Sequence, residues 1–174
     1  MTIKDNLKTL SLTWMGEHLD EELADAARKN RTHQELVERL VAGELELRRA
    51  RAVERRIKAA RIPTLKTLAQ FDWAWPKKIN RDQVKHLFTL RFMADKTNAV
   101  FIGGTGLGKT HLASALAHEA CQQNKHVLFA PAVTIINTLA AAQASNTLAR
   151  AINRYHAPEL LVIDELGYLP IDRT

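Results

Sequence analysis

A glycine-rich segment near the middle of the chain constrains its fold more than any other feature. Residues 103–110 read GGTGLGKT, which has the spacing of a P-loop: glycine, any four residues, then Gly-Lys-Thr. The segment follows a short apolar run at residues 100–102 and precedes a pattern that is typical of a helix. Because a P-loop lies between a strand and a helix, the sequence predicts a strand, a tight loop and a helix in that order.

Each residue type in this loop has a physical purpose in holding a nucleotide phosphate. Glycines let the backbone curl so that successive amides point at phosphate oxygens, and the following helix adds the positive end of its dipole. Lys109 can span the β and γ phosphates of ATP, and the Thr110 hydroxyl can coordinate Mg²⁺. A glycine-rich turn that binds nothing is the alternative, but it leaves the lysine and threonine without a purpose. The predicted nucleotide-binding residues are Gly103, Gly104, Thr105, Gly106, Leu107, Gly108, Lys109, Thr110 and, through its backbone amide, His111.

A second short apolar run ends in two acidic residues. Residues 160–163 are all aliphatic, and Asp164 and Glu165 follow them directly. Parallel strands deliver such residues to the carboxyl edge of a sheet, so Asp164 is predicted to hold magnesium together with Thr110. Glu165 is predicted to be the general base that polarises an attacking water, and Lys109 is the other catalytic candidate. Alone, this pattern fits a solvated turn, but beside a P-loop it favours ATP hydrolysis.

Short apolar runs alternate with helical stretches over the C-terminal part of the chain. We expect strands at residues 100–102, 127–129 and 160–163, with helices near residues 109–123 and 133–155 between them. A strand, helix, strand, helix, strand order implies a parallel sheet. The predicted fold class is therefore α/β, a P-loop NTPase sheet with helices on both faces.

The residues before Pro63 have a helical pattern, without proline and with apolar positions three and four residues apart. Thr32 and Glu35 form a capping-box pattern that predicts a new helix there, and Pro63 ends it. The predicted domains are a basic helical domain over residues 1–66, an aromatic connector and lead-in helix over 67–97, and the N-terminal half of an ATPase domain over 98–174.

The connector carries three aromatic residues, Phe71, Trp73 and Trp75, at alternate positions. Stacking on bases or on adenine is one interpretation of them. Packing of the connector against the α/β domain is the favoured interpretation, because large aromatic rings dominate the energetics of packing.

Positive charge is concentrated in one segment. The chain carries 25 Lys and Arg against 19 Asp and Glu, and residues 48–66 hold eight basic residues and a single acid. Arg48, Arg51, Arg55 and Lys58 recur at helical spacing and are the predicted contacts to the phosphates of double-stranded DNA. The alternative is a solvated helix face, partly paired through Glu44 with Arg48 and Glu54 with Lys58.

The remaining composition excludes several classes of protein. The single cysteine, Cys121, cannot form an internal disulfide, and its apolar neighbours predict a buried thiol. No segment has the length of a signal peptide's apolar run or of a membrane span, so we expect a soluble, cytoplasmic protein with no membrane partner. The seven histidines form no metal-ligand grouping.

Two motifs carry a resemblance to a known family. Residues 108–113, GKTHLA, and residues 164–170, DELGYLP, closely resemble the IstB-type helper ATPases of insertion sequences, which belong with DnaC-like helicase loaders in the AAA+ class. A basic helical N-terminal part and an aromatic connector before the P-loop have the same order as in that family. The resemblance implies an ATP-dependent, DNA-binding homo-oligomer that assists a transposase in engaging target DNA.

The resemblance has one departure. Family members continue past this point with further strands that carry a polar sensor residue and arginines that reach a neighbouring subunit's nucleotide. The expectation is therefore a C-terminally truncated chain with the front half of the ATP site and slow hydrolysis. Two alternatives stay open at this point: a DnaC-like helicase loader, and a fragment that binds DNA or nucleotide without hydrolysis.

Overall fold

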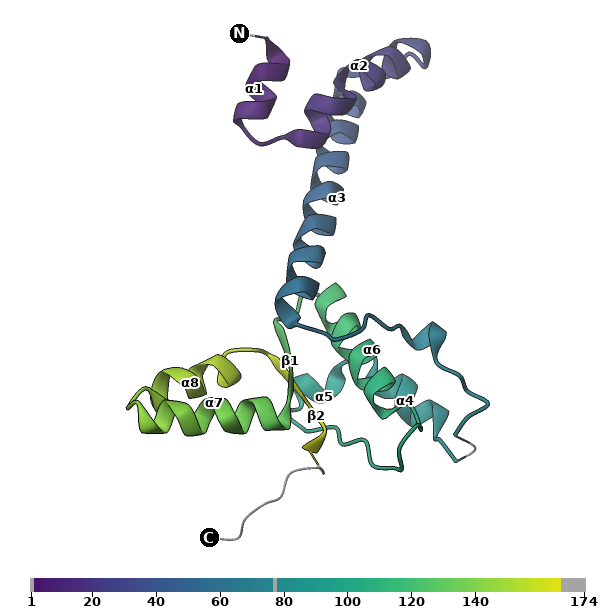
Figure 1. Cartoon of the computed structure of the whole chain (residues 1–174). Helices are drawn as coiled ribbons and strands as arrows, with labels where there is room; N and C mark the ends of the chain where they lie inside the picture. The colour runs from purple at the N-terminus through teal and green to yellow at the C-terminus, as the bar shows by residue number, and fades with distance from the viewer. Residues whose placement is uncertain (1, 77, 167–174) are drawn as a thin grey trace, which may run out of the picture. The chain divides into compact units, whose positions relative to one another are not determined.

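The computed structural model describes residues 2–76 and 78–166 and divides into two compact units, Met1–Glu54 and Arg55–Thr174. The first unit holds α1 (Ile3–Thr9), α2 (Thr13–Arg28) and most of α3 (His33–Ala60), as Figure 1 shows. The predicted capping box at the start of α3 is confirmed. The Thr32 hydroxyl accepts from the Glu35 amide at 3.2 Å, and the Glu35 carboxylate accepts from the Thr32 amide at 2.7 Å.

A buried carboxylate joins α2 to α3 within the first unit. Leu12, the residue before α2, makes no side-chain hydrogen bond that caps this helix. Glu44 of α3 caps it instead, because its carboxylate accepts from the Trp14 and Met15 amides at 2.8 and 3.3 Å. Burial raises the pKa of Glu44, but hydrogen bonds from Arg48 and these two amides lower it below its ordinary value. The link between the two helices is therefore charged and hydrogen-bonded as well as apolar.

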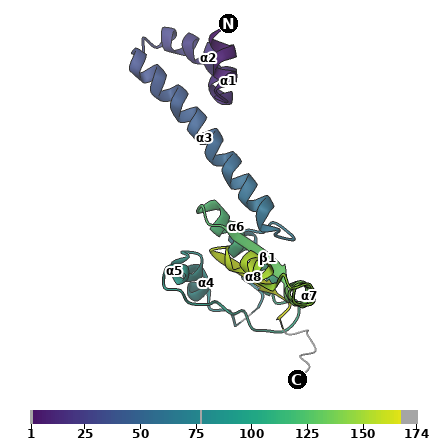
Figure 2. The same cartoon turned by 90° about the vertical axis from the view of Figure 1, so that its left-hand side faces the viewer.

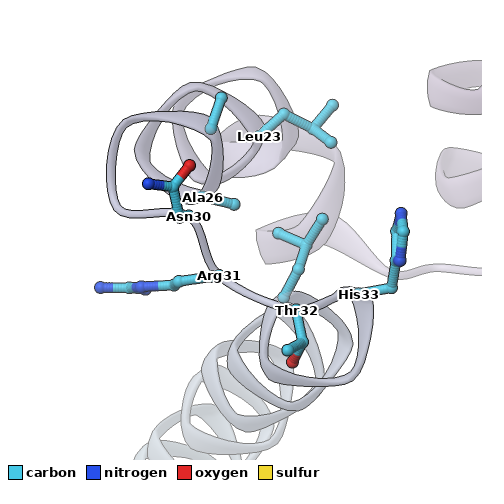
Figure 3. A pocket seen from close by; sticks show the side chains of 8 residues that line it. Leu23, Ala26, Asn30, Arg31, Thr32 and His33 are labelled. Atoms are coloured by element: carbon cyan, nitrogen blue, oxygen red, sulfur yellow. The ribbon is translucent and has the colours of Figure 1, made fainter.

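The turn between α2 and α3 encloses a shallow pocket of about 300 Å³. Figure 3 shows that its lining side chains come from the end of α2, the turn and the start of α3. Arg31 in this turn is paired with Asp25 at 3.0 Å. None of the predicted nucleotide-binding residues lines this pocket.

The second unit contains the P-loop and a small parallel sheet. After the end of α3 it comprises η1 (Leu68–Gln70), α4 (Arg81–Leu87), α5 (Arg91–Ala94), α6 (Lys109–Gln122), β1 (Val127–Pro131), α7 (Ala132–Ala144), α8 (Leu148–His156) and β2 (Leu160–Asp164). In the views of Figures 1 and 2 the chain passes from the connector through α4 and α5 to the long α6. The predicted helix at residues 109–123 and the strands at 127–129 and 160–163 are confirmed.

The sheet positions the ends of both strands side by side. β1 and β2 are parallel, with Val127 opposite Leu160 and Pro131 opposite Asp164. Small residues on α6, chiefly Ala117, Ala120 and the fully buried Cys121, let this helix pack closely against Val127 and Phe129 of β1. The predicted burial of the thiol is confirmed, and burial raises the pKa of Cys121.

The strand predicted at residues 100–102 is wrong. These residues have no regular secondary structure, and in the part of the chain that the structure describes the sheet consists of β1 and β2 alone. Val100 and Ile102 are 73% and 93% exposed. A strand is held by hydrogen bonds to a neighbouring strand, which an apolar run cannot supply by itself.

The single helix predicted near residues 133–155 is also wrong, because a turn at residues 145–147 divides it into α7 and α8. Asn146 adopts the left-handed conformation with φ of 54°, which asparagine tolerates better than most residues. The Ser145 hydroxyl donates to the Ala141 carbonyl at 3.0 Å, and the Thr147 amide donates to the Ala142 carbonyl at 2.8 Å. These bonds close the end of α7.

The described elements nevertheless form a mixed α/β unit, as expected. In the view of Figure 1, α6 lies on one side of the two strands while α7 and α8 lie on the other. Among residues 2–76 and 78–166, no helix has both the length and the apolar character needed to cross a membrane.

Candidate nucleotide-binding site

The glycine-rich loop leads directly into the N-terminus of α6. Gly108 is the N-cap residue of this helix, and both Gly106 and Gly108 have left-handed backbones with φ of 78° and 79°. Only glycine adopts this conformation without a steric penalty. No side-chain hydrogen bond caps α6 at Gly108, and its first turn contains no acidic residue. The helix end therefore offers amide donors and a positive dipole to an anion.

The Lys109 side chain folds back over the loop. Its Nζ atom donates to the Gly104 carbonyl at 2.7 Å, so the ammonium group lies against the backbone of the loop. A phosphate oxygen is a stronger acceptor for an ammonium group than a neutral carbonyl is. The lysine can therefore exchange this internal bond for a contact with a nucleotide.

Thr110 and Asp164 bring the two predicted metal ligands together. The Thr110 hydroxyl donates to the Asp164 carboxylate, with oxygen–oxygen distances of 3.0 and 3.3 Å. Neighbouring ligands of an octahedral Mg²⁺ ion, at 2.0–2.1 Å from it, lie about 3 Å apart. The hydroxyl and the carboxylate are oxygen donors of the kind that Mg²⁺ prefers, so this pair fits a magnesium ion.

Glu165 lies next to this pair at the end of β2. Its amide donates to the Asp164 carboxylate at 3.0 Å, and its backbone is left-handed with φ of 59°. A non-glycine residue in this conformation costs roughly 1–2 kcal/mol, and such strain clusters at functional sites. Its exposed side chain is accessible to solvent water. The structure therefore brings Lys109, Thr110, Asp164 and Glu165 to one end of α6 and β2.

The connector packs beside the loop, in agreement with the favoured interpretation of its aromatic residues, but the individual contacts are ones that the sequence patterns do not predict. Phe71 is 5% exposed, and a Cβ atom added at Gly108 would come within 2.7 Å of its ring. His111, on the first turn of α6, meets the Thr67 carbonyl through Nε2 at 3.1 Å. These contacts join residues about 40 positions apart in sequence, and no local spacing indicates them.

The four predicted DNA contacts, which we call the basic stripe of α3, differ in their surroundings. Arg48 donates to Glu44 at 3.1 Å and to the Ser11 carbonyl at 3.3 Å, and Arg51 donates to the Thr13 hydroxyl at 3.3 Å. All four residues are exposed, including Arg55 and Lys58 further along the same helix. The expected ion pair between Glu44 and Arg48 is present, and no pair between Glu54 and Lys58 occurs in the described part of the chain.

Among the described residues, no group of three or more His, Cys, Asp or Glu is arranged to hold a metal ion.

A strand ending in an acidic pair beside a P-loop defines the P-loop nucleotide-binding class. A family model described as IstB-like ATP binding protein matches residues 5–174. The chain therefore belongs to the family of IstB-like ATP binding proteins, and the resemblance carried by residues 108–113 and 164–170 is confirmed. Of the second motif, residues 167–170 lie outside the residues that the structure describes.

Curated relatives come from bacterial insertion sequences. The chain is 36% identical over 167 residues to a predicted ATP-binding protein of insertion sequence IS21 from Pseudomonas aeruginosa, and the match covers 96% of this chain and 63% of that protein. Predicted ATP-binding proteins of IS232 from Bacillus thuringiensis subsp. berliner and of IS5376 from Geobacillus stearothermophilus are 30% and 31% identical, over 96% and 94% of this chain. The chain spans 67% and 65% of their lengths.

Proposed function

We propose that this protein binds ATP together with Mg²⁺ at the P-loop and hydrolyses it as a helper ATPase of transposition. The observation that carries the proposal is the 3.0 Å contact between the Thr110 hydroxyl and the Asp164 carboxylate. This contact joins the P-loop to the acidic end of β2, which are 54 positions apart in the sequence. A glycine-rich turn without a ligand would not need these two oxygen donors at its mouth.

Each residue of the site has a defined part in the proposed reaction. Lys109 leaves the Gly104 carbonyl and neutralises charge on the β and γ phosphates. Thr110 and Asp164 hold Mg²⁺, which when bound neutralises the charge that develops on the phosphates. Glu165 takes a proton from a water molecule while the oxygen of that water bonds to the γ phosphorus. The bond between the γ phosphorus and the bridging oxygen of ADP breaks at the same time. The backbone amides at the start of α6 hold the phosphate in place.

The biological part of the proposal concerns DNA and a transposase. The names of the relatives place those proteins in insertion sequences, which favours assistance to a transposase over the loading of a replicative helicase. The basic stripe of α3 supplies cations at helical spacing for the phosphates of double-stranded DNA. Assembly into a homo-oligomer, with neighbouring subunits completing the nucleotide site, belongs to the same proposal.

Calorimetry with Mg-ATP tests the nucleotide site. We expect Lys109→Ala to abolish measurable binding, because charge-assisted hydrogen bonds are worth about 1.5–3 kcal/mol each. Lys85→Ala is the matched control, because Lys85 is an exposed lysine on α4 and lies outside residues 103–111. Equal affinity of wild type and Lys109→Ala for Mg-ATP would refute the proposed site.

A further inference from the structure

The contacts between the connector and the P-loop form a continuous set. Phe71 packs with its ring against the backbone of Gly108 and meets the His111 ring edge-on, with centroids 5.4 Å apart. It also joins Leu112 of α6 and Val84 of α4 in one buried cluster. The same ring therefore packs with the N-cap of α6, with its first turn and with α4.

The hydrogen bond of His111 identifies Nε2 as the donor nitrogen of its ring. The Thr67 carbonyl oxygen can only accept, so the Nε2 atom of His111 must carry the hydrogen in the 3.1 Å contact. The same carbonyl accepts from the Gln70 amide at 3.2 Å within η1. Thr67 and Gln70 also form a capping box, since the Gln70 side chain accepts from the Thr67 amide at 3.0 Å. His111 thus attaches α6 to an ordered turn.

These contacts have little freedom to move. A Cβ atom at Gly108 would approach the Phe71 ring to 2.7 Å, a distance at which one of the two groups would have to shift. His111 directly follows Lys109 and Thr110, so the three side chains share the first turn of α6. A displacement of that turn by a bound phosphate therefore changes the contacts of Phe71 and of the Thr67 carbonyl.

We propose that the side chains of His111 and Phe71 lock the connector at residues 67–71 to the P-loop, so that nucleotide occupancy and connector order are coupled. The inference rests on the proposed nucleotide site and assigns His111 as a positioning residue whose side chain touches no nucleotide. Coupling is reciprocal: if ATP orders the connector, an ordered connector strengthens ATP binding, so removal of the lock should weaken ATP binding.

The connector is also held on the side away from the P-loop, at Trp73, so a change at the loop can affect its order. Arg81 of α4 donates to the Trp73 carbonyl at 2.9 Å and lies over the Trp73 ring at 5.6 Å. Trp73 in turn meets Phe71 edge-on at 5.1 Å. A chain of contacts therefore runs from Gly108 through the rings of Phe71 and Trp73 to Arg81 of α4.

Two substitutions at His111 separate its ring from its hydrogen bond. His111→Phe keeps an aromatic ring and removes the donor, while His111→Gln keeps a donor and removes the ring. His118→Phe is the matched control on the same helix, where the histidine faces Gln122 instead of the connector. Circular dichroism and thermal melting establish that each variant folds, and Phe71→Leu tests the lock from its other side.

The readouts are the Kd for Mg-ATP by calorimetry and amide hydrogen exchange of residues 68–71 with and without Mg-ATP. We expect His111→Phe to raise the Kd about threefold to tenfold, the worth of one net hydrogen bond, and His111→Gln to recover most of this affinity. Mg-ATP should slow exchange at Gln70 and Phe71 in wild type and in His118→Phe, but not in His111→Phe. Phe71→Leu should also lack this protection.

The outcomes distinguish the lock from the site on which it rests. If wild type binds no Mg-ATP, the proposed function fails and the lock fails with it. If wild type binds Mg-ATP while His111→Phe and Phe71→Leu match it in affinity and in exchange, the lock alone is overturned. Equal effects from His118→Phe would also overturn the lock, since they would show a general response of α6.

Discussion

The P-loop and the basic stripe of α3 both place cationic groups for phosphate, but they differ in what holds these groups. Lys109 is fixed by the left-handed glycines before it and by the helix that it begins. The four residues of the stripe lie together only because of their spacing along α3. Two of them already make local hydrogen bonds: Arg48 donates to Glu44 and Ser11, and Arg51 donates to Thr13. A motif with defined geometry therefore supports a sharper prediction than a concentration of charge.

The sharpest consequence concerns Glu165. Glu165→Gln should lower the rate of ATP hydrolysis by about 10²–10⁴, the usual contribution of a general base, while the Kd for Mg-ATP changes little. Phosphate release and calorimetry measure the two quantities. Glu119→Gln, on α6 away from the acidic end of β2, is the control. If Glu165→Gln hydrolyses ATP as fast as wild type, Glu165 is not the general base.

The second prediction divides the basic stripe into its two halves. Arg55→Gln with Lys58→Gln should lower the salt dependence of duplex binding by roughly 1.8 in log–log slope, about 0.9 for each phosphate that the variant no longer neutralises. Arg48→Gln with Arg51→Gln should lower the slope less, because Arg48 is already paired with Glu44, and should also lower the melting temperature, because these two side chains bond Ser11 and Thr13 at the start of α2. Fluorescence anisotropy over a salt series and thermal melting give both readouts.

A change of charge elsewhere serves as the reference for this experiment. Lys85→Gln with Arg91→Gln removes two positive charges from α4 and α5 and leaves α3 intact. If this pair changes the slope as much as the α3 pairs do, binding depends on net charge alone. If neither α3 pair changes it, the stripe is a solvated face.

The smallest expected effect is on the pH dependence of stability. The pKa of Glu44 lies below its ordinary value of 4.5, so its ionised form stabilises the fold above that value, and this contribution disappears as pH falls below it. Glu44→Gln should cost about 1–3 kcal/mol at neutral pH and less in acid, because the hydrogen bonds to a charged group are removed. Thermal melts from pH 7 to pH 3, with the exposed Glu46→Gln as control, measure the difference. If Glu44→Gln destabilises the fold by the same amount at every pH, the effect comes from altered packing and not from the charge of Glu44.

Local signals account for most of what the sequence predicts correctly. The glycines before Lys109 and the capping box at Thr32 each act within a few residues, so their structures follow from short-range chemistry. The aliphatic residues before Asp164 form a strand, as predicted, because β1 lies beside them. The equally apolar residues 100–102 have no such neighbour in the described part of the chain, and no pattern within three residues could indicate that.

The contacts around the P-loop show the same limit. The spacing of Lys109 and Thr110 identifies the phosphate and metal ligands, and the structure adds that Thr110 meets Asp164. The packing of Phe71 on Gly108 and the bond from His111 to the Thr67 carbonyl depend on how the connector returns to α6. Such long-range contacts are set by tertiary packing, which periodicity and motif spacing do not encode.

The magnesium dependence of ATP binding in Asp164→Asn tests the central claim most directly. Calorimetry with ATP in the presence of Mg²⁺ or of a chelator should give tighter binding with Mg²⁺ for wild type. Asp164→Asn should gain much less affinity from Mg²⁺ than wild type, because the ion would keep Thr110 and the phosphates as ligands but lose the carboxylate. An equal gain from Mg²⁺ in wild type and Asp164→Asn would contradict the assignment of this site.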